Sequence, residues 1–448
     1  MKLPAALCVP VCALGVALSA PASFAAEPPA PRNSSPASSY GVCSHLTWGE
    51  FSARDRTFSL CRVAGLGTVR CDFTWSMVEK TKGSWDFSRT DAIVADAKAS
   101  GVAILPILYW DKNDYPKPHV DPDPWRNYIG HVAERYAADI PVFEIWNEQD
   151  LRPKDNVGNP TNYFAVLKSA YETIKAAAPG ARVAIGGFGE ADGKHTPLGY
   201  IEELYKLGGG AYFDIMNIHP YSVPFGPEGF LLPNLENLRA LMAKYGDAEK
   251  PIWITEIGWP TNERKPGFDP KKGDKWHYMG GVSEADSARF LSRALGIAFA
   301  EGVEMFMPYE LRDREFERYN NEAHYGLCRN NFVPKPAFAA YAAFTAMRPA
   351  GSVQKSDRPW RDGNFFFPQW LRPADADAKR EGKPLGADAG MLWTKDSSGD
   401  RRILRFSSDA VRFFDHLGAE VWPTPRDGGY EMDVTDKPTY FVGGELNP

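Results

Sequence analysis

Short apolar runs that alternate with longer amphipathic stretches constrain the fold of this chain more than any other feature. Eight such runs, each typical of a buried strand, lie at 40–46, 67–73, 102–108, 142–147, 183–188, 213–219, 252–256 and 303–309. Parallel strands need a long connection between them, usually a helix. Strand followed by helix, eight times over, predicts a (β/α)8 TIM barrel in residues 40–348. A doubly wound open sheet is the alternative, but no Gly-rich phosphate turn follows the first run.

Helix signals fall between these runs, where the barrel requires them. Asp123 is predicted to cap one helix that Pro124 opens, and Thr161 is predicted to cap another. Ser283 begins a third, with Asp286 three residues later as a loose capping box.

The pattern changes after residue 348. Residues 349–448 contain short strand-like pieces separated by Gly, Pro and Asp turns, and within 430–434 apolar residues alternate strictly. We predict a small antiparallel β-sandwich there, with 349–362 as the junction. Its expected strands are 364–369, 391–394, 402–406, 410–414, 420–422, 430–434 and 439–442.

The amino-terminal segment has the pattern of a secretory signal peptide. Lys2 precedes an uncharged run over 3–20, and small residues surround Ala25. We expect residues 1–26 to be removed and the protein to be secreted or periplasmic. The Pro- and Ser-rich residues 27–39 are expected to form a flexible leader, and no later run is long enough to span a membrane.

Composition excludes some partners and leaves others open. The formal net charge is −6, whereas binding of nucleic acid needs clustered Lys and Arg. After signal removal Cys43, Cys61, Cys71 and Cys328 remain, which allow three disulfide pairings or buried free thiols. No HExxH or paired CxxC motif is present, so we predict neither a metal nor a cofactor. The sequence makes no prediction about oligomeric state.

Polar and aromatic residues mark the ends of the predicted strands, where a barrel of this kind carries its catalytic groups. Asn147 and Glu148 end the fourth run and Glu256 ends the seventh, so two carboxyl groups face each other across the barrel mouth. Further candidate substrate-binding residues near such ends are Arg70, Trp110, His219, Tyr221, Trp259, Tyr309 and Glu310.

Two carboxyl groups across an aromatic-lined pocket are suited to cleaving a glycosidic bond. One protonates the departing oxygen, and the other stabilises or captures the sugar carbon. Mutual repulsion would raise the pKa of one carboxyl, while the Arg70 charge would keep the other ionised.

Two motifs carry a family resemblance. Ile-Trp-Asn-Glu at 145–148 and Trp-Ile-Thr-Glu-Ile-Gly-Trp at 253–259 resemble the acid/base and nucleophile strands of glycoside hydrolase clan A. The chain looks closest to family 39, with family 5 as neighbour, over residues 40–347. The resemblance implies hydrolysis of O-glycosyl bonds in an oligo- or polysaccharide, with retained anomeric configuration and no cofactor.

The resemblance also implies residue roles. Glu148 is then the general acid/base, Glu256 the nucleophile, and Asn147 a ligand of the sugar 2-hydroxyl. His219 and Tyr221 match the sixth-strand pair that helps to orient the nucleophile.

Departures from the family pattern concern two places. Gln149 stands where a proline commonly follows the acid/base, and Tyr309 stands where many members place a tryptophan under the sugar. Glu310 adds an acidic group at that strand end, suited to reading hydroxyls or a basic sugar.

Several residues have competing interpretations. We expect Glu144 to be a packing or rim residue, and His45 to be either structural or ligand-binding. The basic and aromatic loop 260–282 is interpreted as a substrate-binding lid, with a solvated insertion as the alternative, and 312–318 as a solvated rim. Competing functions are a catalytically decayed glycan-binding protein and a metal-dependent barrel enzyme such as a sugar isomerase.

Overall fold

The computed structural model describes residues 38–112, 114–189, 197–272, 278–314, 317–374, 376 and 385–447. The predicted signal peptide and residues 27–37 of the predicted leader lie outside these ranges. In the part of the chain that is described, no helix is both long and apolar enough to cross a membrane.

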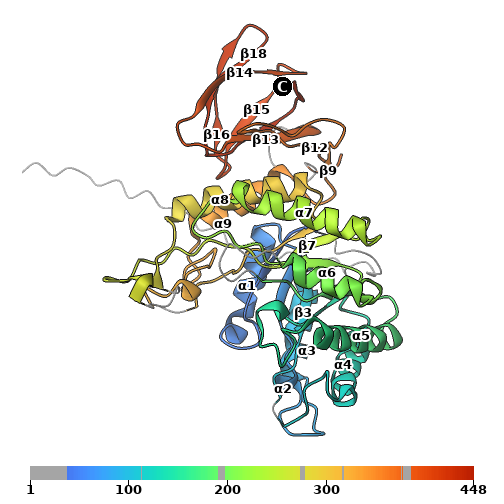
Figure 1. Ribbon diagram of the computed structural model, residues 1–448. Coiled ribbons are helices and arrows are strands. Elements are labelled where there is room, and N and C mark those ends of the chain that lie inside the picture. The colour runs from blue at the N-terminus through green and yellow to red at the C-terminus, as the bar shows by residue number, and fades with distance from the viewer. Residues whose placement is uncertain are drawn as a thin grey trace, which may run out of the picture. The chain divides into compact units, whose positions relative to one another are not determined.

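Eight parallel strands form the barrel (Figure 1). Strands β1 to β5 pair in order, as do β6 to β8. Bridges Ala184–Ile215 and Phe188–Ile218 join the two sheets on one side, and Tyr40–Phe306 joins them on the other. The closed ring confirms the predicted barrel and excludes the open sheet. The strands are β1 (Gly41–Cys43), β2 (Thr68–Asp72), β3 (Ala103–Leu108), β4 (Val142–Ile145), β5 (Arg182–Ile185), β6 (Met216–Ile218), β7 (Ile252–Ile254) and β8 (Met305–Phe306).

Helices surround the strands and bury their apolar faces against them. Trp125, Tyr128 and Ile129 of α4, for example, are all fully buried. The helices are α1 (Arg54–Val63), α2 (Trp75–Val78), α3 (Ser88–Ala99), α4 (Pro122–Tyr136), α5 (Pro160–Ala177), α6 (Leu198–Lys206), α7 (Leu231–Lys244), α8 (Glu284–Ala300) and α9 (Pro336–Met347).

Two of the predicted helices begin two residues earlier than expected. The α4 cap is Asp121, whose carboxylate accepts from the Asp123 amide at 3.2 Å, and not Asp123. The α5 cap is Asn159, which accepts from the amide of Thr161 at 3.0 Å. In both cases an earlier Asx-Pro pair fits the cap and first-turn positions equally well and adds two residues to the helix.

The third predicted start is confirmed. Ser283 caps α8 by accepting a hydrogen bond from the amide of Asp286 at 3.0 Å.

The carboxyl-terminal residues form two antiparallel sheets that pack face to face. One contains β10, β11, β13, β19, β15 and β16, with β12 and β9 alongside, and the other contains β17, β18, β14 and β20. Phe365, Leu392 and Phe441 belong to the apolar layer between them. The predicted β-sandwich is therefore confirmed. Its strands are β9 (Val353–Gln354), β10 (Arg361–Asp362), β11 (Phe365–Phe366), β12 (Gln369–Leu371), β13 (Asp388–Thr394), β14 (Asp400–Phe406), β15 (Arg412–Asp415), β16 (Glu420–Val421), β17 (Thr424–Arg426), β18 (Gly429–Val434), β19 (Thr439–Val442) and β20 (Leu446–Asn447).

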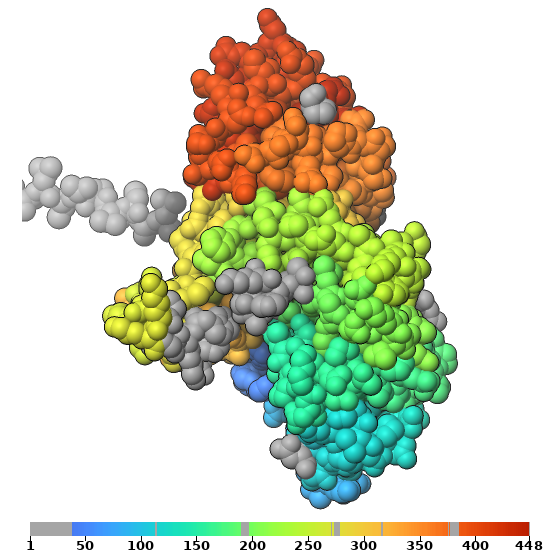
Figure 2. Space-filling view, in the orientation of Figure 1, coloured from blue at the N-terminus to red at the C-terminus, as the bar shows by residue number. Residues whose placement is uncertain are grey.

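The sandwich shares a hydrophobic core with the barrel. Met391 and Trp393 of β13 lie against Gly296 of α8, where a Cβ would come within 2.9 Å of both side chains. Figure 2 shows the orange and red residues of the sandwich directly adjoining the green and yellow residues of the barrel on the surface.

The four cysteines that follow the predicted signal peptide are free thiols. Cys43, Cys61, Cys71 and Cys328 are all buried. None of the three disulfide pairings allowed by the sequence is formed, and the alternative of buried thiols describes these residues.

Candidate active site

The two candidate catalytic carboxyls lie where the backbone leaves β4 and β7. Trp146 and Glu148, just beyond β4, have φ values of 77° and 49°, in the left-handed region that side chains other than glycine seldom adopt. Such conformations cost energy and persist where the surrounding structure enforces them, often at functional sites. Here they end the strand and turn Glu148 toward the barrel mouth.

The end of β5, the strand next to β4, provides the space that this arrangement needs. A Cβ on Gly187 would lie 2.0 Å from His219 Nε2, so only glycine fits there. One ligand atom from each of Glu148, His219 and Glu256 lies within 4.8 Å of the others. The predicted pair of carboxyls therefore meets at one point, with an imidazole between them.

Glu256 is almost completely buried and is held by two donors. Arg70 Nη1 donates to Oε1 at 2.5 Å, and the Tyr221 hydroxyl donates to Oε2 at 2.9 Å. Burial alone would raise the pKa of Glu256, but the influence of His219, of Arg70 and of the Tyr221 hydrogen bond holds it below its usual value. Glu256 is therefore an ionised carboxylate, the form that a nucleophile requires.

Arg70 connects the two sides of the site. Besides Glu256, it binds both oxygens of Glu144 at 2.7 and 2.8 Å, and it donates to Asn147 Oδ1 at 2.6 Å. Glu144 has no exposed surface, so the rim position considered for it is wrong. Its carboxylate is the buried counter-ion that fixes Arg70, and this role was missed in the sequence.

His219 takes part in a buried hydrogen-bond chain. The Thr255 hydroxyl donates to Asn217 Oδ1 at 2.9 Å, so it accepts from His219 Nε2 at 3.0 Å. The other ring nitrogen, Nδ1, then lies 3.3 Å from Glu148 Oε1 and 3.8 Å from Glu256 Oε2. A proton on this edge of the ring can be shared with Glu148.

Asp150 is a further titratable group beside Glu148. It accepts from the Gly189 amide at 3.1 Å. Burial, followed by repulsion from Glu148, raises the pKa of Asp150 to about 6, against the opposing effect of its backbone hydrogen bonds. Nothing in the amino-acid pattern distinguished it from a solvated loop aspartate.

Glu310 lies in a different place from the one predicted. Its carboxylate has no exposed surface and is paired with His45 at 3.0 Å and with Arg314 at 3.0 Å. Since each oxygen is paired with a cationic side chain, Glu310 has a structural role just beyond β8. The direct contact with substrate expected of it is not possible in this arrangement.

His45 is a fixed cation in the structure. Burial alone would lower the pKa of His45, but its contacts with Asp72 and Glu310 raise it to about 10. The neighbouring Trp48, whose indole donates to Asp72 at 3.2 Å, is 59% exposed at the same rim and was missed in the sequence.

The predicted aromatic residues separate into two groups. Tyr309 is partly exposed, receives a hydrogen bond from Arg314, and packs edge-on against Tyr325. Trp110 is also partly exposed, and its indole N–H has no partner among the described residues. Both can therefore contact a sugar.

Trp259 belongs to the core. It is 2% exposed, donates to the Phe225 carbonyl at 2.8 Å and packs against Phe290. The substrate contact predicted for Trp259 is therefore wrong, because its ring is buried and its indole N–H is already bonded to a backbone carbonyl.

The loop 260–282 is described only in part, and residues 273–277, including Trp276 and His277, lie outside the described residues. Glu263 pairs with Arg318 at 2.5 Å, which ties the loop to the neighbouring segment 312–318. Arg312 and Arg314 of that segment pair with Glu50 and Glu310, so it is more than the solvated rim expected. The lid role stays a prediction.

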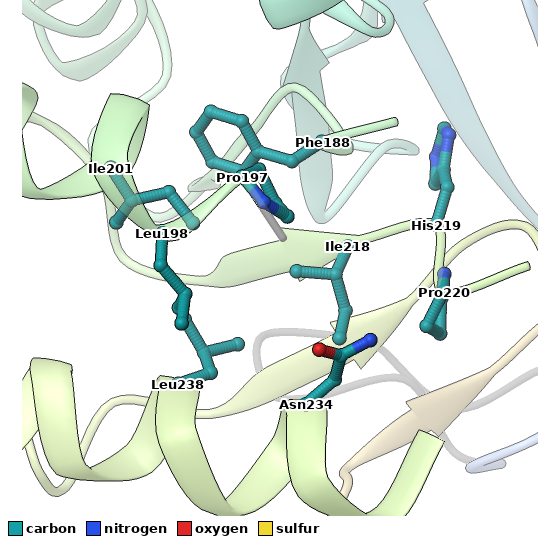
Figure 3. Close-up of a pocket in the computed structure, with 9 residues that line it drawn as sticks. All are labelled: Phe188, Pro197, Leu198, Ile201, Ile218, His219, Pro220, Asn234 and Leu238. Atoms are coloured by element: carbon teal, nitrogen blue, oxygen red, sulfur yellow. The ribbon is translucent and has the colours of Figure 1, made fainter. Parts of the chain in front are cut away.

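A small cavity of about 20 Å³ lies behind His219 (Figure 3). Ile218 of β6, Leu198 and Ile201 of α6 and Leu238 of α7 line it, and His219 stands at its edge. A space of this size could hold about one water, but its lining is apolar. We interpret it as a packing gap and not as a substrate pocket.

Comparisons with known proteins agree with the predicted resemblance at the level of fold. No family model matches the chain. A β-xylosidase from Geobacillus stearothermophilus is 23% identical over 264 residues, which are 54% of this chain. The chain thus spans about half (49%) of the length of that relative.

Solved structures cover more of the chain. A family 39 glycoside hydrolase from Bacteroides cellulosilyticus has a TM-score of 0.71 at 21% identity, covering 90% of this chain and 80% of its own. A family 39 β-xylosidase from Caulobacter crescentus has a TM-score of 0.57 at 16% identity, with coverages of 94% and 98%. A family 30 xylanase from Clostridium acetobutylicum has a TM-score of 0.57 at 12% identity, covering 92% and 96%. The chain shares the barrel-and-sandwich fold of these clan A enzymes.

Proposed function

We propose that this protein is a retaining O-glycoside hydrolase that acts on an oligo- or polysaccharide. The observation that carries the proposal is the spacing of Glu148 and Glu256, whose nearest ligand atoms lie within 4.8 Å. Retaining enzymes hold their carboxyl groups about 5–5.5 Å apart, whereas inverting enzymes separate them by about 6.5–9.5 Å to admit a water.

The two carboxyl groups then divide the chemistry between them. In the first step Glu256 attacks the anomeric carbon, the glycosidic C–O bond breaks, and Glu148 gives its proton to the leaving oxygen. In the second step a water attacks the same carbon, Glu148 takes its proton, and the ester bond to Glu256 breaks. His219 Nδ1, 3.3 Å from Glu148, is placed to share the proton that cycles here.

The donor set around Glu256 favours this chemistry over a metal site. Glu148, His219 and Glu256 are close enough to hold a cation. However, both oxygens of Glu256 already accept hydrogen bonds, from Arg70 and Tyr221. A cation would have to compete with the buried Arg70 charge, so the metal-dependent alternative has little support.

Product stereochemistry tests the retaining mechanism. Because the fold neighbours include β-xylosidases and xylanases, an aryl β-D-xyloside and a panel of other aryl glycosides are the first substrates to try. Proton NMR at early times should show the anomer of the substrate. The opposite anomer as first product would overturn the proposal.

Variants assign the two carboxyls. Glu256→Gln should lower kcat by at least about 10³-fold, and azide or formate should restore turnover of activated substrates in a Glu256→Gly variant. Glu148→Ala should lose activity mainly on substrates with poor leaving groups, because these depend on the proton. Full activity in Glu256→Gln would contradict the assignment.

A second candidate is a glycan-binding protein that has lost catalysis. It is prompted by Tyr309, which replaces the tryptophan expected under the sugar, and by the burial of Glu310. It predicts sugar binding without hydrolysis over the whole panel.

We also propose that the protein is exported, on the basis of the signal-peptide pattern in residues 1–26. The amino terminus of protein recovered from its native host should begin after Ala25 or Ala26. An uncleaved cytoplasmic product would contradict export.

A further inference from the structure

A second cleft opens beside the candidate active site. It has a volume of about 730 Å³, within the range of ligand-binding pockets. Ser222 forms part of its wall. The preceding residue, Tyr221, donates a hydrogen bond to Glu256 in the candidate active site. From Ser222 the cleft runs between the β6–α7 loop, the second and third turns of α8 and the β13–β14 turn of the sandwich.

The floor of this junction cleft is a fixed network of buried and partly buried charges. Glu228 binds Arg293 Nη2 at 3.1 Å and accepts from the indole of Trp393 at 2.9 Å. Arg289 pairs with Asp436 at 2.8 Å. These contacts join α8 to the sandwich, so the shape of the cleft is set before any ligand arrives.

Backbone geometry keeps the cleft open near its floor. A Cβ on Gly226 would lie 2.2 Å from Arg293 Nη2 and 3.1 Å from Glu228 Oε2. A side chain at position 226 would therefore push Arg293 away from its ion pair with Glu228, and glycine leaves that pair undisturbed.

The walls of the cleft differ in chemistry. Phe225, Phe230 and Phe290 lie on the barrel side, and Phe225 is 73% exposed. Exposed Lys395 and Asp396 lie on the sandwich side. Among the described residues Lys395 makes no ion pair, so its ammonium group is available to a ligand.

The combination of an aromatic wall and a charged wall matches the surface of a sugar chain. A pyranose ring presents C–H groups on its faces, which pack on aromatic rings, and hydroxyls on its rim, which need hydrogen-bond partners. The lining carries three cationic side chains and three anionic ones, which disfavours a strongly charged polyanion. These are Arg289, Arg293, Lys395, Glu228, Asp396 and Asp436.

We propose that the junction cleft binds sugar residues of an oligosaccharide that lie beyond the bond being cut. The proposal rests on the proposed glycosidase function, because it makes the cleft a continuation of that substrate site. The sandwich then contributes to substrate binding through its β13–β14 turn, in addition to supporting the barrel.

The experiment compares substrates of different length. Phe225→Ala removes an exposed side chain but keeps the carbonyl that accepts from Trp259. Lys395→Ala removes the available cation on the opposite wall. Trp422→Ala is the matched control, because Trp422 is 83% exposed on the sandwich and does not line the cleft. Circular dichroism and melting temperature check that each variant is folded.

KM is measured for an aryl β-D-xyloside and for xylohexaose, cellohexaose and mannohexaose. Phe225→Ala should raise KM for the best hexasaccharide about fivefold, leave KM for the short substrate within about twofold, and leave kcat unchanged. Lys395→Ala should act in the same direction, and Trp422→Ala should have no effect. Equal effects on long and short substrates, or none on either, would overturn the proposal while leaving the glycosidase function intact.

A binding measurement separates failure of the cleft from failure of the proposed activity. If no glycoside is hydrolysed, titration of the full-length protein with the same three hexasaccharides still reports on the cleft. Binding that weakens in Phe225→Ala but not in Trp422→Ala supports the cleft without catalysis. Absence of binding of all three hexasaccharides, or binding that is equal in both variants, overturns it.

Discussion

Arg70 and Glu144 form a two-pronged ion pair inside the barrel, at 2.7 and 2.8 Å, with Arg70 2% exposed and Glu144 fully buried. The same guanidinium reaches Glu256 at 2.5 Å. One buried cation is therefore shared by a structural carboxylate and the candidate nucleophile. Its position couples the stability of the fold to the charge of the active site.

Removal of Arg70 should destabilise the protein strongly. Arg70→Met leaves two buried carboxylates without their cation, and we expect a loss of about 3–5 kcal/mol in the free energy of unfolding, measured by urea denaturation. The double variant Arg70→Met/Glu144→Leu should recover part of this loss. Arg126→Met, which breaks an exposed pair with Asp123, should cost less than about 1 kcal/mol. Strict additivity of the two buried substitutions would contradict the coupling.

Loss of the Tyr221 hydroxyl should shift the acidic limb of the pH–rate profile. Tyr221 donates to Glu256 and lowers the pKa of that carboxyl, which must be ionised to react. Tyr221→Phe should therefore raise this pKa and move the acidic limb of kcat/KM upward by about one pH unit. Tyr430→Phe, whose hydroxyl donates to a carbonyl in the sandwich, should leave the profile unchanged. A limb that stays in place, or moves downward, would refute the role of Tyr221.

Loss of the hydrogen bond between Thr255 and His219 should slow turnover without weakening substrate binding. Thr255→Val removes the partner of Nε2, so the ring loses the contact that holds its orientation. We expect kcat to fall about tenfold, or about 1.4 kcal/mol, with KM nearly unchanged and with recovery in Thr255→Ser. Thr345→Val in α9, where a buried hydroxyl donates to carbonyls, controls for a loss of stability alone. A KM effect in place of a kcat effect would argue against a positioning role.

Asp150 should make stability depend on pH near neutrality. Burial and Glu148 raise the pKa of Asp150 to about 6, so folding favours its protonated form. Ionisation of Asp150 therefore disfavours the folded state above about pH 6. This penalty disappears as the pH falls toward the lower pKa that Asp150 has in the unfolded chain. Asp150→Asn keeps an acceptor for the Gly189 amide and should raise the melting temperature at pH 7.5 but not at pH 4. The corresponding gain in the free energy of unfolding at pH 7.5 should be at most about 3 kcal/mol. An equal change at both pH values would show that titration of Asp150 is not responsible.

The cysteines provide a simple chemical check. The thiols of Cys43, Cys61, Cys71 and Cys328 are free, so mature protein unfolded without reductant should react with four equivalents of a thiol reagent. The native protein should react slowly because all four are buried, and dithiothreitol should not change its melting temperature. Fewer than four reactive thiols after unfolding would reveal a disulfide.

Apolar periodicity and capping motifs predicted the structure correctly where interactions between neighbouring residues decide it. Each of the eight apolar runs contains or overlaps a strand, because a strand buried on both sides needs an unbroken apolar segment. Ser283 was found as a cap because its capping box is read from neighbouring residues. The starts of α4 and α5 were misplaced because two cap signals stand two residues apart, and the choice between them depends on packing of the first turn.

Side-chain direction beyond the strand ends could not be read in this way. Period-two alternation ends with β4 at Ile145, and the left-handed Trp146 and Glu148 redirect the chain after it. The same applies to Glu310 and Trp259, which stand at strand ends in the sequence but are buried in the structure. Glu144 was misjudged because a charged residue within a barrel is stable only with a partner, and Arg70 lies 74 positions away.

The sequence by itself determined the order of strands and helices, the barrel and sandwich classes, and the presence of Glu148 and Glu256 at facing strand ends. These follow from periodicity and motif, which act over a few neighbouring residues. Only the tertiary structure decided which charges pair. The sharing of Arg70 between Glu144 and Glu256, the burial of Glu310 and the junction cleft depend on contacts between distant segments. Such contacts form when closure of the barrel and docking of the sandwich exclude water from them.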